Sequence, residues 1–335
     1  MPVACAIKRH CCAWNITLTD NNANATQAVA PAQTWLNKLS QRPWWADLLL
    51  LSAVWGSSFM FTKIAAQDIG AMPTAFGRVA VAALFLVPLL LWKRETASLA
   101  QHWKKAFLIG IFNSGIPFAA YAYALLTIST STGAIVNAST ALFGAVIAWL
   151  WLKDKPSLSR TIGLVLGFTG VCLLALQNAR SAPTGDLTSQ LVGMLVCLLA
   201  PLCYGLSASY TKLHFSGVPA LVSATGSQLG AALFLAPFAL WLWPDHAMQW
   251  GTIASLLVIG VVCTGMAYIL FFRIIELAGA SKALTVTYAV PVFAVFYGVT
   301  FLGETITMPM VLCAGVILVG ISLSTGLLRL PGTKA

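Results

Sequence analysis

Two short runs of polar and small residues interrupt apolar stretches, and they are the first candidates for chemistry. Residues 113–117 combine an amide, a hydroxyl, a glycine and a proline, and residues 263–265 occupy the matching place in the second half of the chain. These groups donate and accept hydrogen bonds, and a helix weakened by Gly or Pro also exposes backbone groups. The pattern indicates reversible binding of a small solute. The alternative is that Gly and Ser only allow helices to pack closely.

The other candidates are hydroxyls, amides and aromatic rings that fall within apolar stretches of both halves. An unpaired polar group costs several kcal/mol in hydrocarbon, so each needs a partner or a cavity. Asn137 carries a whole amide, and a bond to a neighbouring helix explains it as well as a substrate does. Aromatic residues also serve as packing or interfacial residues. The candidate substrate-binding residues are Trp55, Ser58, Asn113, Ser114, Tyr121, Asn137, Tyr204, Ser207, Thr264, Tyr268 and Tyr288.

Charged residues lie mainly at the ends of the apolar stretches. Lys63 and Arg78 are close enough to one end to extend toward the membrane surface, and the alternative is a role in attracting an anion. Asp154 and Glu304 each follow an apolar stretch and are expected to cap or anchor helices. No carboxylate falls in the middle of a stretch, which leaves facilitated diffusion, exchange and ion coupling open.

The elements that position these residues are predicted to be membrane-spanning helices. Of 335 residues, 59% are apolar and 8% are charged, which is too little polar surface for a water-soluble globule. A span needs roughly 20 mostly apolar residues, and ten such stretches follow one another. We therefore expect an all-α polytopic membrane protein. The predicted spans are 45–65, 73–92, 105–126, 131–152, 159–176, 188–212, 219–242, 252–273, 281–301 and 308–328.

The net charge of +10 is explained by orientation in a membrane rather than by nucleic-acid binding. Of the 19 Lys and Arg residues, only Arg180 falls in an outer connection, while Lys63 and Arg78 lie within spans. The others fall on the side predicted to be cytoplasmic, together with both termini. Residues 1–44 are expected to be a flexible cytoplasmic tail or the product of a mis-assigned translation start, and residues 329–335 a second cytoplasmic tail.

Cysteine and histidine usage predicts neither a metal site nor another cofactor. Cys172, Cys197, Cys203, Cys263 and Cys313 lie singly within apolar stretches, and Cys5, Cys11 and Cys12 lack ligands at metal-binding spacing. The four His residues lie outside the spans, and there is no HExxH helix. A membrane-embedded enzyme therefore ranks below a transporter. A channel-like facilitator is a further alternative.

The sequence also contains an internal repeat. Shifting the chain by about 150 residues aligns Gly, Ser, Thr, Lys, Pro and Trp positions of the first half with those of the second. The two copies, 45–176 and 188–328, contain five spans each. Because five is odd, the second copy enters the membrane upside down relative to the first. Inverted repeats allow a central site to open alternately to each side.

The chain resembles the EamA-like branch of the drug/metabolite transporter superfamily from about residue 45 to residue 328. Two departures are Ala141 in place of an expected Pro and Asp154 in place of Glu. The resemblance implies a ten-helix carrier of the bacterial cytoplasmic membrane, commonly an exporter of amino acids or other metabolites, with a small-molecule substrate and no nucleic acid. Substrate, direction and oligomeric state stay open. The residues that carry the resemblance are Trp55-Gly56-Ser57-Ser58, Arg78, Asp154, Glu304 and residues 289–294.

Overall fold

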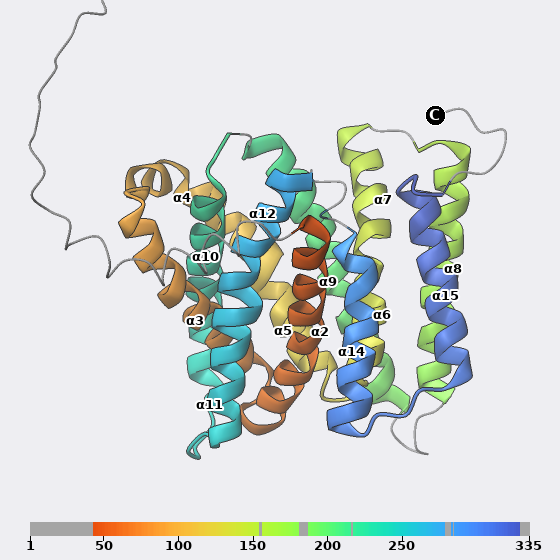
Figure 1. The fold of residues 1–335 in the computed structure, drawn as a ribbon. Helices are drawn as coiled ribbons and strands as arrows, with labels where there is room; N and C mark the ends of the chain where they lie inside the picture. Colours follow the sequence, from red (N-terminus) through yellow and green to blue (C-terminus); the bar gives the residue numbers. More distant parts are fainter. Residues whose placement is uncertain are drawn as a thin grey trace, which may run out of the picture. The chain divides into compact units, whose positions relative to one another are not determined.

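The computed structural model describes residues 43–153, 156–180, 187–215, 217–278, 283 and 285–328. The expected tails lie outside these residues, apart from residues 43 and 44, and so does Asp154. From Trp44 onward the chain forms one compact unit. Its described residues form helices and the turns between them, without a strand (Figure 1).

The helices follow one another in two series that match the two halves of the sequence. The first series is α2 (Trp44–Ile69), α3 (Ala71–Trp92), α4 (Thr96–Gly110), η1 (Ile111–Gly115), α5 (Ile116–Ala124), α6 (Thr130–Ala138), α7 (Thr140–Leu152) and α8 (Leu158–Arg180). The second is α9 (Leu187–His214), α10 (Ala220–Trp241), α11 (Trp250–Leu257), η2 (Val258–Met266), α12 (Ala267–Ala278), α14 (Val286–Leu302) and α15 (Met308–Ser324). The segments η1 and η2 are π-helical.

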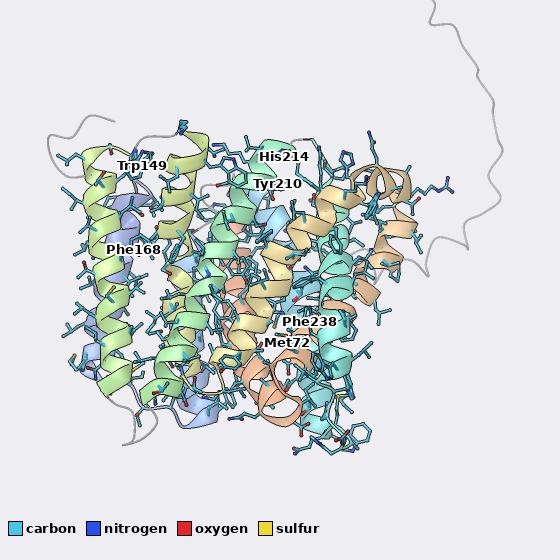
Figure 2. All side chains as sticks on the ribbon, turned by 180° about the vertical axis from the view of Figure 1, so that it is seen from behind. Met72, Trp149, Phe168, Tyr210, His214 and Phe238 are labelled. Carbon is cyan, nitrogen blue, oxygen red and sulfur yellow. The ribbon has the colours of Figure 1, made fainter. Side chains whose placement is uncertain are left out.

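Eight of the described helical stretches are long and apolar enough to cross a membrane. Helices α14 and α15 are also apolar, and their 17 residues each reach the lower end of the length that a span needs, about 17 to 25 residues. Large apolar side chains cover the outer faces, as Figure 2 shows around Trp149 and Phe168. The chain is therefore a multi-pass membrane protein.

Exposed tryptophans mark the two ends of the helices. Trp45 and Trp92 lie at the start of α2 and the end of α3, and Trp241 and Trp250 lie at the end of α10 and the start of α11. In Figure 1 the α3 to α4 connection is at the top and α11 is at the bottom. Tryptophan prefers the headgroup level of a bilayer, so these two groups fit opposite membrane surfaces.

Two span boundaries differ from the sequence-based prediction. The third span is continuous from Thr96 to Ala124, so most of the predicted connection at residues 93–105 is helical. The fourth is interrupted between α6 and α7 at Ser139. There the hydroxyls of Ser139 and Thr140 donate to the carbonyls of Val136 and Asn137, and such local bonds compete with the regular helical ladder. The interruption lies next to Asn137.

The helices pack in pairs that join the two halves. Helix α3 packs on α10 and α8 on α15, and each pair consists of helices that the shift of about 150 residues superposes. Likewise α2 packs on α14 and α9 packs on α7. The contact of α8 with α15 depends on glycine: a Cβ atom on Gly320 would collide with the backbone nitrogen of Gly167. Close packing of small residues is the usual way in which helices associate in lipid.

Candidate functional site

A cavity of about 360 Å³ lies among the central helices and takes its walls from both halves. This volume is in the range of small-molecule sites, about 300 to 1,000 Å³. Eight of the eleven residues selected from the sequence line it. They are Trp55, Ser58, Asn113, Tyr121 and Asn137 from the first half, and Tyr204, Thr264 and Tyr268 from the second.

The three remaining candidates lie outside the cavity wall. Ser114 is buried and accepts a hydrogen bond of 2.9 Å from Nε2 of Gln228, which joins η1 to α10. Ser207 is buried in α9. The hydroxyl of Tyr288 is 2.9 Å from that of Thr325. These contacts give Ser114, Gln228 and Tyr288 structural partners within the protein.

The π-helical segments present Asn113 and Thr264 to the cavity. The Asn113 amide nitrogen donates to the Tyr268 hydroxyl at 2.9 Å, a bond between the two halves. The Thr264 hydroxyl donates to the carbonyl of Ile259, five residues earlier, at 2.8 Å. Wider π-helical turns often occur at functional sites because they redirect side chains. The sequence predicts helices weakened by Gly or Pro at these two positions, and at both the span continues but widens into π-helical turns.

The glycines of the same segments pack helices together. A Cβ atom on Gly115 would lie 3.0 Å from the ring of Phe234 in α10, and one on Gly265 would lie 2.5 Å from the ring of Phe85 in α3. The glycines allow close helix contact, while the neighbouring polar side chains face the cavity.

Arg78 is the residue that the sequence interpretation placed wrongly. It does not extend to the membrane surface: it is 8% exposed and lines the cavity. Its Nε donates to the Thr264 hydroxyl at 3.1 Å, and its guanidinium carbon lies 3.7 Å from the centre of the Phe118 ring. A cation over an aromatic face is attracted by the ring quadrupole. The one signal in the sequence was a charged residue within an apolar span, which by default marks a functional position, but its nearness to the end of the span fits burial and extension to the surface equally well.

Asn137 has a partner within the protein, as its burial requires. The Tyr121 hydroxyl donates to its amide oxygen at 2.7 Å. Thr140 adds a longer bond of 3.5 Å to the same oxygen. The amide nitrogen of Asn137 bonds to no residue in the described part of the chain, although the side chain lines the cavity. Its two N–H donors are thus directed to cavity contents.

Aromatic rings form much of the remaining wall. The centroids of Trp55 and Phe271 are 5.5 Å apart, those of Phe59 and Tyr121 5.4 Å, and those of Tyr121 and Tyr204 6.4 Å. These distances are typical of stabilising ring pairs. The rings give the cavity flat apolar faces around a few polar groups.

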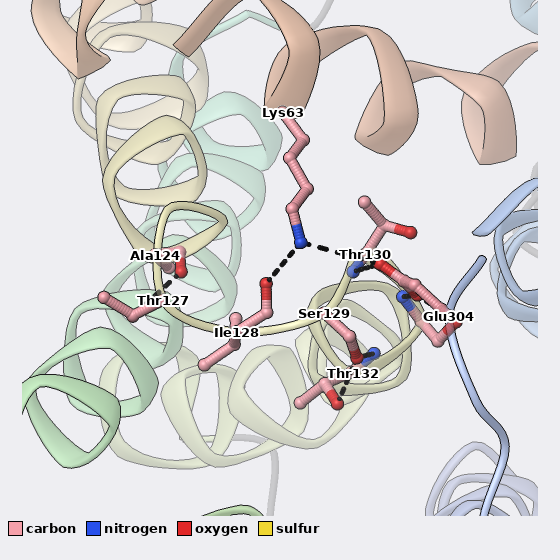
Figure 3. Close-up of polar contacts among 9 residues, drawn as sticks. Lys63, Ala124, Thr127, Ile128, Ser129, Thr130, Thr132 and Glu304 are labelled. Atoms are coloured by element: carbon pink, nitrogen blue, oxygen red, sulfur yellow. Dashed lines mark hydrogen bonds and ion pairs between the residues drawn. The ribbon is translucent and has the colours of Figure 1, made fainter. Parts of the chain in front are cut away.

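An ion pair joins the halves at one end of α2 (Figure 3). Lys63 Nζ lies 3.7 Å from Oε1 of Glu304 and donates to the carbonyl of Ile128 at 3.3 Å. Glu304 also accepts bonds from the backbone of Thr130 and Ser131 at the start of α6. Burial raises the pKa of Glu304, but the bonds from Ser131 and from the two backbone N–H groups outweigh burial, so its pKa is below the usual value. The predicted capping role of Glu304 is confirmed.

A second ion pair joins the halves at the other end of α2. Asp47 lies in the first turn of α2 and is 1% exposed, and its Oδ2 is 3.3 Å from Nε of Arg273 in α12. Helix α2 is therefore linked at both ends to elements of the second half.

The profile of the EamA-like transporter family matches residues 43–176 and again residues 191–326. The chain belongs to the EamA-like transporter family. The two matches follow the two halves expected from the repeat closely. Membership in this family, together with the helices, identifies a membrane-embedded transporter.

Several known proteins are similar to the chain. The uncharacterized transporter YoaV of Bacillus subtilis is 25% identical over 281 residues, which cover 83% of this chain and 95% of the relative. The uncharacterized transporter YvbV of the same species is 26% identical, with 81% and 87% covered. Protein PagO of Salmonella typhimurium is 22% identical, with 85% and 94% covered. A solved crystal structure shares the fold, with a TM-score of 0.59 and 17% identity over 84% of this chain and 96% of its own.

Proposed function

We propose that this EamA-like protein is a secondary carrier that exports a small metabolite, an amino acid or a similar neutral or zwitterionic solute, across the bacterial cytoplasmic membrane. Ten spans form two inverted five-helix repeats with both termini in the cytoplasm. The observation that carries the proposal is the cavity of about 360 Å³, whose polar groups come from both halves. Polar groups at this depth are costly in lipid, and they are typical of a solute pathway.

Two contacts between the halves support alternating access. The pair of Lys63 with Glu304 and the pair of Asp47 with Arg273 each join a first-half helix to a second-half element. A rocking motion of one repeat against the other separates one of these contacts while the opposite one persists. The cavity then opens to one side at a time, as inverted repeats permit.

Transport is tested with the purified full-length protein in lipid vesicles. Uptake and efflux of a panel of labelled amino acids are measured with and without a pH gradient, and empty vesicles give the background. We expect at least one solute to move faster than the background. Failure with every solute, while the protein stays folded, would contradict the carrier proposal.

A pair of variants on α9 tests whether the cavity is the pathway. Ala208 lines the cavity, and Ala208→Trp should fill part of it and lower transport at least tenfold. Leu199 is exposed on the same helix and does not line the cavity, so Leu199→Trp should transport like the wild type. Normal transport by Ala208→Trp would show that the solute takes another route.

A further inference from the structure

Among the described residues that line the cavity, Arg78 is the one charged side chain. A guanidinium keeps its charge in proteins, even where it is buried. Removing such a charge from water costs several kcal/mol unless an opposite charge compensates it. Ring contact with Phe118 and one bond to Thr264 offset only part of this cost.

No carboxylate in the described part of the chain pairs with Arg78. Three of the described acids form ion pairs elsewhere: Asp47 with Arg273, Asp68 with His246 and Glu304 with Lys63. The buried charge of Arg78 is thus left to be balanced by an anionic ligand that binds in the cavity.

The contacts of Arg78 also determine which part of it a ligand can reach. Nε is bonded to Thr264, and one face of the group lies against Phe118. The four N–H donors of the two terminal nitrogens have no partner among the described residues. This planar edge matches the two oxygens of a carboxylate, which it binds through two parallel hydrogen bonds.

The rest of the cavity limits the charge and shape of the ligand. A doubly charged phosphate would need a second cation, and no other lines the wall. Among the described lining residues an ammonium group would find no carboxylate, only neutral acceptors such as the Asn113 amide oxygen and the hydroxyls of Ser58 and Thr62, and the aromatic faces. The rings of Trp55, Tyr204 and Phe271 suit an apolar body.

We propose that the solute carries a single carboxylate on a mostly apolar body, that this carboxylate binds the terminal nitrogens of Arg78, and that an amino group is not required. The inference rests on the proposed transport function and changes its substrate class from neutral or zwitterionic solutes to monocarboxylates, whether zwitterionic or anionic. It includes hydrophobic amino acids and the corresponding acids without the amino group. It excludes amines and solutes with a net positive charge.

Binding is tested with three probes that share one carbon skeleton. These are leucine, 4-methylpentanoate, which lacks the amino group, and 3-methylbutylamine, which lacks the carboxylate. A ligand that binds the folded state raises thermal stability in proportion to the logarithm of its concentration over Kd. We expect the purified wild type in detergent to be stabilised by the two acids and not by the amine. Equal stabilisation by the amine would overturn the inference.

Variants at Arg78 give the second arm of the test. Arg78→Gln should weaken the binding of both acids at least tenfold, and Arg78→Lys should keep part of the affinity because it retains the charge but not the planar fork. Arg160→Gln is the control, since it removes one positive charge at an exposed position of α8. Unchanged affinity in Arg78→Gln would overturn the inference.

The stability of the unliganded variant separates a binding role from a structural one. If the charge of Arg78 is balanced only when an anionic ligand binds, it does not stabilise the unliganded protein. Removing the charge then leaves the melting temperature without ligand unchanged or raises it. A lower melting temperature together with unchanged affinity would show that Arg78 only holds the helices together, and the inference would fall.

The transport assay distinguishes failure of this inference from failure of the proposed function. Vesicles that move solutes regardless of a carboxylate, in the wild type and in Arg78→Gln alike, would keep the carrier and reject the role of Arg78. A wild type that binds the acids through Arg78 but moves no solute would support the site and reject the carrier.

Discussion

Oε1 of Glu304 accepts a hydrogen bond of 2.6 Å from the backbone N–H of Thr130, the first residue of α6. Its Oε2 accepts bonds from the backbone N–H and the hydroxyl of Ser131 at 3.1 and 2.7 Å. The N-terminus of a helix has unsatisfied N–H donors and a partial positive charge, so a carboxylate is a favourable cap. A residue of the second half thus caps a helix of the first, and Lys63 adds a longer contact.

This geometry predicts unequal effects for the two members of the ion pair. Glu304→Gln should lower the free energy of unfolding by about 2 kcal/mol, since its NH₂ group faces N–H donors of α6. Lys63→Met should cost about 1 kcal/mol or less, because the helix terminus still holds the carboxylate. Thermal unfolding of both variants in detergent checks whether Glu304→Gln loses more stability than Lys63→Met. An equal or larger loss in Lys63→Met would mean that the ion pair dominates.

The stabilisation of the folded state by the Glu304 carboxylate should depend on pH. Its pKa is lower in the folded protein than in the unfolded chain, so its stabilisation is fully present above the unfolded value, about 4.3. The stabilisation is lost as pH falls through the lower folded pKa. The difference in melting temperature between wild type and Glu304→Gln should therefore be constant above about pH 5.5. It should shrink as the pH falls below about 4. A difference that does not narrow as the pH falls would contradict this origin.

The helices were predictable because bilayer thickness fixes the length of a span. Much of the cavity wall was predictable because a polar group within a span must face a cavity or a partner in the protein. Trp55, Asn113 and Tyr268 illustrate this. The burial of Arg78 was not predictable, since its distance from the end of the span is compatible with an extended side chain. Phe118 and Thr264 decide its position, and both contacts join residues far apart in the sequence.

The break at Ser139 was missed for a related reason. Serine and threonine are tolerated inside helices, and only the observed bonds to the carbonyls of Val136 and Asn137 show that the ladder is interrupted there. Residues 131–152 are apolar on both sides of the break and are long enough together for a single span. Local sequence therefore gave no reason to divide the span.

Two glycines of α15 give a matched test of helix packing. Gly320→Ala should destabilise the protein by about 1 to 3 kcal/mol, because its Cβ atom would collide with the backbone nitrogen of Gly167 and force α8 away. Gly315 has open space around its position, so Gly315→Ala should be neutral or stabilising by up to about 1 kcal/mol. Thermal unfolding in detergent measures both. Similar changes in stability in the two variants would show that α8 and α15 can move apart without a loss of stability.

The inverted orientation of the halves can be tested by labelling single cysteines in a variant whose native cysteines are replaced. Gln101 is exposed on α4 and Asp245 is exposed between α10 and α11, and α4 packs along α10. In Figure 1 α4 is at the top and α11 at the bottom, so the two sites lie at opposite ends of the helices. The distribution of basic residues predicts that the α4 end faces the cytoplasm.

A thiol reagent that does not cross membranes should therefore label Asp245→Cys in intact cells and should label Gln101→Cys only after the cells are opened. His214→Cys, at the exposed end of α9, should behave like Gln101→Cys, because an odd number of spans separates Asp245 from each of them. Labelling of Gln101→Cys and His214→Cys from opposite sides would rule out five spans per repeat. The alternating exposure of a shared cavity would then lose its structural basis.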